Sequence, residues 1–192
     1  SFVPIEKLNR LTKNNHQGIV ASISPISTLG IDDIEKKLKT NESILILILD
    51  GITDTKNFGA IVRSAECFDV NMIIIPKAGS SSINGETIKS SSGAIFNVPI
   101  CKVDHIKDAM FLLKENEINL VTTSDKGKAS LYEHKYKSKT ALIMGSEGKG
   151  VSKSVMKLSD QVVNIEMKGK VSSLNVSVAT GIFLSEFRRQ FN

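Results

Sequence analysis

Residues 43–50 read "SILILILD", and this stretch decides the fold class. Six consecutive apolar residues end in one aspartate, which is typical of a strand buried on both faces. Strands of this kind belong to parallel sheets, because the helices that connect parallel strands cover both faces of the sheet. The stretch therefore predicts a parallel sheet, with the polar Asp50 at the carboxyl end of one of its strands.

The remainder of the chain alternates strand and helix patterns in the same way. Helical patterns cover 57–68, 105–117 and 151–159, and a closing helix runs through Phe187. Further strands are predicted at 71–77, 98–103, 118–124, 140–145 and 161–167. Strands separated by helices indicate βαβ units, so we expect an α/β fold with a mostly parallel sheet and helices on both faces. Ligands of such sheets bind at the carboxyl ends of the strands.

The composition is that of a folded globular protein. The chain has 192 residues, of which 41% are hydrophobic and 23% charged, and no apolar run approaches the length of a membrane span. Its two cysteines and three histidines are dispersed, so neither a disulfide framework nor a metal site is expected. A net charge of +5 is compatible with a polyanionic partner, although lysine-rich surfaces are more often simply solvated.

Two loops after strands carry candidate functional residues. In "LDGITDTKNFGAIVRSAE" (49–66), Asn57 is expected to cap the helix and Gly59 to allow close approach of another backbone. Arg63 either lies exposed on that helix or binds an anion at the sheet edge. "LIMGSEGKGVS" (142–152) is a glycine-rich turn that matches neither a P-loop nor a dinucleotide fingerprint. A plain strand–turn–helix connection is the alternative for this second loop.

The stretch "KVSSLNVSVATGIFLSEFRRQ" (170–190) predicts the closing helix and a further polar site. Small residues, Ser177 and Gly181 among them, occupy a second helix face and would let a neighbouring element approach closely. Asn175, near the start, either caps the helix or orients a ligand. The apolar stripe at helical spacing consists of Leu174, Val178, Ile182, Phe183 and Phe187.

Three stretches together resemble the SpoU/TrmH family of RNA ribose 2′-O-methyltransferases, which belongs to the SPOUT superfamily. They are "NFGAIVRSAE" (57–66), "IMGSEGKGVS" (143–152) and "VNIEMKGKVSSLNVSVATG" (163–181), in this order. "HQGIVA" (16–21) and "KSSSGAIFNVPI" (89–100) are similar to the bacterial branch that methylates a guanosine of 23S rRNA. That branch usually has Glu where this chain has Ser172, and the family usually has Gly where this chain has Asp69.

The resemblance implies a C-terminal deep trefoil knot, a homodimer, and S-adenosylmethionine bound in the knot, with no metal. The implied catalytic residues are Asn57, Arg63, Glu147, Ser173 and Asn175, with Arg63 reaching the site of the partner subunit. The family assigns the base to the arginine at position 63, but a guanidinium stays charged at neutral pH. We therefore expect Arg63 to hold the adjacent phosphate and to stabilise the developing alkoxide. The implied cofactor residues are Thr123, Ser124, Gly145, Ile165, Met167 and Leu174.

The resemblance also implies how the chain is organised and what it acts on. Residues 1–25 would be the end of a linker from an N-terminal RNA-binding domain, and residues 26–192 would form the SPOUT methyltransferase domain. The implied function is S-adenosylmethionine-dependent methylation of the ribose 2′-hydroxyl of a guanosine in 23S rRNA. The alternatives are a tRNA ribose 2′-O-methyltransferase and a non-catalytic RNA-binding remnant of the fold. The expected location is the bacterial cytoplasm, with an organelle as the alternative, and no membrane is involved.

Overall fold

A computed structural model of the chain describes residues 2–13, 15–38 and 43–191. Its helices are α1 Ile5–Leu11, α2 Asp32–Leu38, α3 Thr55–Cys67, α4 Gly85–Ser90, the 3-10 helix η1 Ala94–Phe96, α5 Ile106–Glu115, α6 Lys153–Leu158 and α7 Val176–Phe191. Its strands are β1 Ile44–Asp50, β2 Met72–Pro76, β3 Ile100–Val103, β4 Asn119–Thr123, β5 Ala129–Ser130, β6 Lys139–Gly145 and β7 Gln161–Asn164.

The strands form one parallel sheet in the order β3-β2-β1-β6-β4-β7-β5. The predicted parallel sheet is confirmed, and every strand predicted from the sequence is present. The two-residue strand β5 was not predicted, because its pairing with β7 leaves no periodic pattern. The strand order changes direction at β1, which has β2 on one side and β6 on the other. Such a switch point is where open α/β sheets place their ligands.

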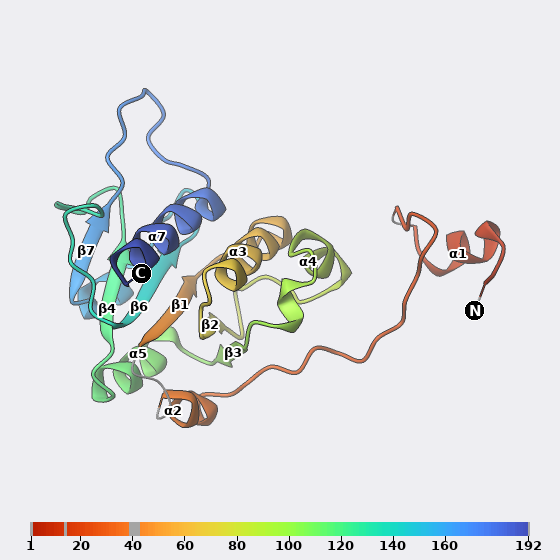
Figure 1. Cartoon of the computed structure of the whole chain (residues 1–192), viewed down its shortest axis with the longest axis horizontal. Helices are drawn as coiled ribbons and strands as arrows, with labels where there is room; N and C mark the ends of the chain where they lie inside the picture. Colours follow the sequence, from red (N-terminus) through yellow and green to blue (C-terminus); the bar gives the residue numbers. More distant parts are fainter. Residues whose placement is uncertain (1, 14, 39–42, 192) are drawn as a thin grey trace.

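Helices cover both faces of the sheet, as predicted. Alternate residues of β1 point to opposite faces, and both sets are buried because each face carries a helical layer. Leu47 packs in the layer formed with α3, η1 and α7, whereas Ile46 packs in the layer formed with α2, α5 and α6. In Figure 1, α3 and α7 lie in front of the sheet, and α2 and α5 lie below it.

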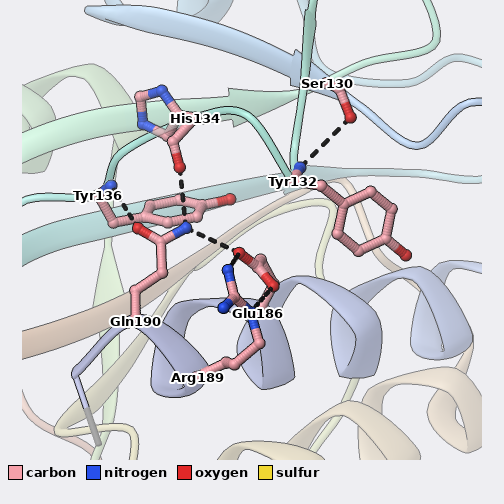
Figure 2. A network of polar contacts seen from close by, with 7 residues as sticks. All are labelled: Ser130, Tyr132, His134, Tyr136, Glu186, Arg189 and Gln190. Carbon is pink, nitrogen blue, oxygen red and sulfur yellow. Dashed lines mark hydrogen bonds and ion pairs between the residues drawn. The ribbon is translucent and has the colours of Figure 1, made fainter.

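Helix α7 is anchored at its C-terminal end by a network of polar contacts, shown in Figure 2. Gln190 accepts the backbone N–H of Tyr136 at 3.0 Å and donates to the backbone oxygen of His134 at 2.9 Å. It also donates to Glu186 at 2.8 Å, and Arg189 binds the same buried carboxylate with two N–H groups, at 2.7 and 2.8 Å. The hydrogen bonds from Arg189 lower the pKa of Glu186. The network fixes α7 against the segment that leads into β6.

Helix α7 also holds the end of α3. Arg188 donates from Nε to the backbone oxygen of Phe68 at 2.7 Å and from Nη2 to that of Asp69 at 2.5 Å. These carbonyls end α3, where orphan carbonyl groups need partners. Asp69 has φ +51°, a left-handed backbone conformation that glycine adopts without steric cost. Gly59 lies where α3 meets α4, and a Cβ there would collide with Ser90, so the expected close approach is confirmed.

The first part of the chain lies away from the sheet. Helix α1, which the sequence patterns did not predict, buries none of its residues. An extended segment joins it to the domain, as Figure 1 shows. Among the described residues, no helix combines the length and the apolar composition needed to cross a membrane.

Candidate active site

The site is built at the switch point of the sheet, where β1 and β6 end side by side. Asp50 pairs with Gly145 in the parallel register, so the loops that follow the two strands begin next to each other. The loop after β6 folds back through a hydrogen bond from Gly150 N–H to the Ser146 oxygen at 2.9 Å. Asp50 Oδ2 then accepts the backbone N–H of Ser152 at 2.8 Å. This bond ties the end of β1 to the start of α6.

The three glycines of this loop have different functions. Gly148 and Gly150 have φ values of +83° and +66°, which is the left-handed backbone expected of a glycine-rich turn. Gly145 is needed for space instead. A Cβ at Gly145 would collide with the backbone atoms of Gly150 and Val151. The folded-back loop therefore lies directly against the end of β6.

Helix α3 begins beside this loop, and its cap differs from the prediction. Asp54, not Asn57, caps the helix, because its Oδ1 accepts the backbone N–H of Asn57 at 2.7 Å. The prediction that Asn57 is the N-cap was wrong, since the chain offers an earlier carboxylate three residues before it. Asn57 lies inside the first turn, and its side chain is free to bind elsewhere.

Asn57, Glu147 and Asn175 form one hydrogen-bonded network. Asn175 Nδ2 donates to Asn57 Oδ1 at 2.9 Å and to Glu147 Oε1 at 2.6 Å, across sequence separations of 118 and 28 residues. Glu147 Oε1 also accepts the backbone N–H of Val176, the first residue of α7, at 3.3 Å. The positive end of the α7 dipole stabilises this carboxylate. Three of the five expected catalytic residues thus meet at the ends of β1 and β6.

Arg63 and Ser173 lie outside this network. Arg63 is exposed on α3, six residues beyond Asn57, which places it about 9 Å further along the helix axis. Ser173 is exposed in the segment before α7. Within the described part of the chain, neither side chain makes a hydrogen bond or an ion pair.

The residues expected to bind the cofactor follow three neighbouring strands, β6, β4 and β7. Thr123 ends β4, and its Oγ1 donates to the backbone oxygen of Ile143 in β6 at 3.1 Å. The backbone N–H of Ser124 donates to Val163 of β7 at 2.9 Å. All six are half-buried: Thr123, Ser124, Gly145, Ile165, Met167 and Leu174.

The segment between β7 and α7 has the properties that an adenosine site requires. Residues 166–174 lie outside helices and strands, and their backbone groups make no hydrogen bonds with the described residues. Figure 1 shows this segment as a long loop beyond the ends of the strands. Free backbone donors and acceptors beside the half-buried side chains of Ile165 and Leu174 can read and enclose a purine base. The residues present therefore fit S-adenosylmethionine.

Two residues that the sequence places near the site make contacts there that were not predicted. Asp50 links β1 to α6, and Ser177 donates from its backbone N–H and its Oγ to Asn175 Oδ1, at 2.9 and 2.5 Å. The signal for Asp50 is a lone charge closing an apolar strand. The signal for Ser177 is its position two residues after an asparagine at a helix start. In the described ranges, no group of three or more His, Cys, Asp or Glu side chains is placed to hold a metal ion.

Comparisons with known proteins identify the family. The model of the SpoU rRNA Methylase family matches residues 44–185. A relative from Salmonella typhi, named 23S rRNA (guanosine-2′-O-)-methyltransferase RlmB, is 39% identical over 175 residues, which are 91% of this chain and 72% of the relative. The similarity to this relative covers most of both chains and is therefore not confined to the three stretches that suggested the family.

Two solved structures share the fold. The SpoU methyltransferase AviRb from Streptomyces viridochromogenes, in complex with AdoMet, has a TM-score of 0.75 at 27% identity, covering 81% of this chain and 64% of AviRb. The AdoMet-bound rRNA methyltransferase from Sinorhizobium meliloti has a TM-score of 0.77 at 27% identity, covering 86% and 62% of the two chains. This chain thus spans less than two thirds of either enzyme. The chain belongs to the SpoU rRNA methylase family.

Proposed function

We propose that this chain transfers the methyl group of S-adenosylmethionine to the ribose 2′-hydroxyl of a guanosine in 23S rRNA. The observation that carries the proposal is the network of Asn57, Glu147 and Asn175 beside the residues that fit the cofactor. The relative from Salmonella typhi, which is named for this reaction, supports the choice of substrate. Because bacterial rRNA is found in the cytoplasm, the proposal includes a cytoplasmic location for the enzyme.

S-adenosylmethionine, when bound, supplies a methyl group on a positively charged sulfur. The 2′-oxygen would take the methyl carbon from the sulfur, and the hydroxyl proton would pass to a phosphate or to water. Ile165 and Leu174 enclose the base and exclude water, while the network holds the ribose beside the cofactor. Arg63 holds the neighbouring phosphate and stabilises the developing alkoxide.

The enzyme acts as a homodimer, with Arg63 supplied to the site of the second copy. Arg63 is exposed on α3, about 9 Å along the helix axis from Asn57, and its side chain makes no hydrogen bond with the described residues, which supports this assignment. The 2′-hydroxyl then lies between groups of two subunits. A site shared in this way is incomplete in a monomer.

The RNA approaches from the side of the three loops that follow β4, β6 and β7. These loops carry exposed lysines whose charges can neutralise phosphates near the site. Exposed positions of this kind are Lys126, Lys128, Lys149, Lys168 and Lys170. The surface charge therefore favours RNA at the same edge of the sheet as the network.

The chain path between β6 and α7 forms a deep trefoil knot, with residues 26–192 as the catalytic domain and residues 1–25 as a connecting segment. The contact of Glu147 with Val176 supports the knot, since it brings the loop after β6 against the start of α7. The exposed helix α1 and the extended segment after it support the assignment of the connecting segment.

The test is to map ribose 2′-O-methylation in rRNA and tRNA from cells that lack the gene. Cells carrying the wild-type gene or the Asn57→Ala variant provide the comparison. We expect one guanosine of 23S rRNA to lose its methyl group without the gene, and the wild-type gene alone to restore it. Loss of a tRNA methyl group instead, or no loss at all, would refute the proposed substrate.

A further inference from the structure

Every hydrogen-bonding position of the Asn175 side chain is occupied within the protein. A primary amide offers two N–H donors and two lone pairs on its oxygen. Nδ2 donates to Asn57 and to Glu147, at 2.9 and 2.6 Å. Oδ1 accepts the backbone N–H and the Oγ of Ser177, at 2.9 and 2.5 Å. No position is left with which Asn175 could bind a substrate.

Ser177 determines which way the Asn175 amide faces. The backbone N–H of Ser177 can only donate, so the atom facing it must be the amide oxygen of Asn175. The amide nitrogen of Asn175 then faces Asn57 and Glu147, and the same reasoning fixes the orientation of the Asn57 amide. Asn57 must present its oxygen to Asn175, so its own Nδ2 points out of the network.

Two polar atoms at the edge of the network are left without a partner. Among the described residues, Asn57 Nδ2 and Glu147 Oε2 make no hydrogen bond. One is a donor and the other an acceptor, which is the pair of groups that a ribose hydroxyl can use at the same time. These two atoms are the substrate-facing groups of the site.

We propose that Ser177 and Asn175 are positioning residues that orient the substrate-facing groups of Asn57 and Glu147, rather than ligands of the ribose. The proposal rests on the proposed function for the identity of the substrate. It adds Ser177 to the site, and it gives Asn175 a positioning role in place of the catalytic role that the family resemblance implies. Because Ser177 lies in the first turn of α7, its hydroxyl and its backbone N–H both bind the amide oxygen of Asn175.

A matched pair of variants separates this role from simple helix capping. Ser177→Thr keeps the hydroxyl, whereas Ser177→Val has the same shape without it. We expect the Val variant to lose about tenfold in kcat relative to the Thr variant, which corresponds to one hydrogen bond. KM values for S-adenosylmethionine and RNA should stay within about twofold, because neither residue binds them. Equal kcat values for the two variants, or a change in KM alone, would overturn the proposal.

A second measurement does not depend on turnover. In the wild type, both Nδ2 hydrogens of Asn175 are bonded, so its side-chain amide signals in nitrogen-15 NMR spectra should exchange slowly with water. We expect this protection in the Thr variant and in the control Ser185→Ala, which alters an exposed serine of the same helix. It should be weaker in the Val variant, which keeps the backbone N–H of residue 177 but lacks the hydroxyl that holds Asn175 Oδ1. Unchanged protection in the Val variant would refute the positioning role, even if the substrate proved to be a different RNA.

Discussion

The substitution Gly145→Ala tests how the site is assembled. Gly145 ends β6, and a Cβ there would lie well within 3.0 Å of backbone atoms in Gly150 and Val151. No flexible side chain can move aside, so the returning loop must retreat by about 1 Å. Two contacts oppose this shift, because Asp50 holds the Ser152 N–H and Glu147 binds Asn175.

The expected losses follow from this collision. Overpacking of this kind costs about 2 kcal/mol of stability, which lowers the unfolding midpoint by about 4–8 °C in a domain of this size. A displacement of about 1 Å at Glu147 reduces the rate of methyl transfer by about 100-fold. Differential scanning calorimetry measures the first effect. Single-turnover transfer of a tritiated methyl group to 23S rRNA measures the second.

Gly181→Ala is the matched control, because it is the same chemical change in α7. Its Cβ would meet only Ser64 Oγ, at an ordinary contact distance of 3.9 Å. The expectation that Gly181 is needed for close approach was therefore wrong. Alanine inside a helix is favoured over glycine by about 1 kcal/mol, so this variant should be more stable and fully active. The reasoning is refuted if Gly145→Ala retains the wild-type midpoint and rate.

Three other measurements test separate features of the molecule. Arg63→Ala and Glu147→Ala chains, each inactive alone, should recover about a quarter of the wild-type activity when they are co-expressed. Half of the dimers are then mixed, and each mixed dimer has one intact site of two. No recovery would contradict a shared site. A thiol reagent should modify the exposed Cys67 quickly in the folded protein but reach Cys101 only after unfolding. Cys101 is buried, and burial raises the pKa of its thiol to about 11. Rapid modification of both cysteines in the folded protein would contradict this. Burial lowers the pKa of His134 below 6.5, so the unfolded chain binds a proton there first and stability should fall as pH drops below about 6.5. The variant His134→Gln should show a smaller fall in unfolding midpoint between pH 7.5 and 5.5, and an equal fall would contradict the assignment.

The sheet could be predicted from the sequence because its strands are buried on both faces. The run of apolar residues in β1 and the helical stripes between strands follow directly from that burial. Strand β5 and helix α1 could not be predicted in this way. β5 has two residues, and α1 has no buried face to leave a pattern.

The site was predictable in its location but not in its contacts. Strand ends pointed to the loops after Asp50, Ser124, Met144 and Met167, because ligands of parallel sheets bind at the carboxyl ends of the strands. The contact between Asn57 and Asn175 spans 118 residues and leaves no periodic signal, so only the family motifs suggested it. Asn57 was taken for a cap because asparagine is common at that position, whereas Asp54 supplies the cap. The knot, the dimer and the functions of the individual site residues stay predictions.

The position of β6 has a consequence for synthesis on the ribosome. β1 pairs with β2 soon after both are made, but its other edge pairs with β6, whose residues follow roughly 95 positions later. At about 5–20 residues per second, the apolar edge of β1 stays open for about 5–20 s. An open edge of this kind pairs readily with other chains. A nascent chain of this enzyme is therefore open to such pairing until its own C-terminal third closes the sheet.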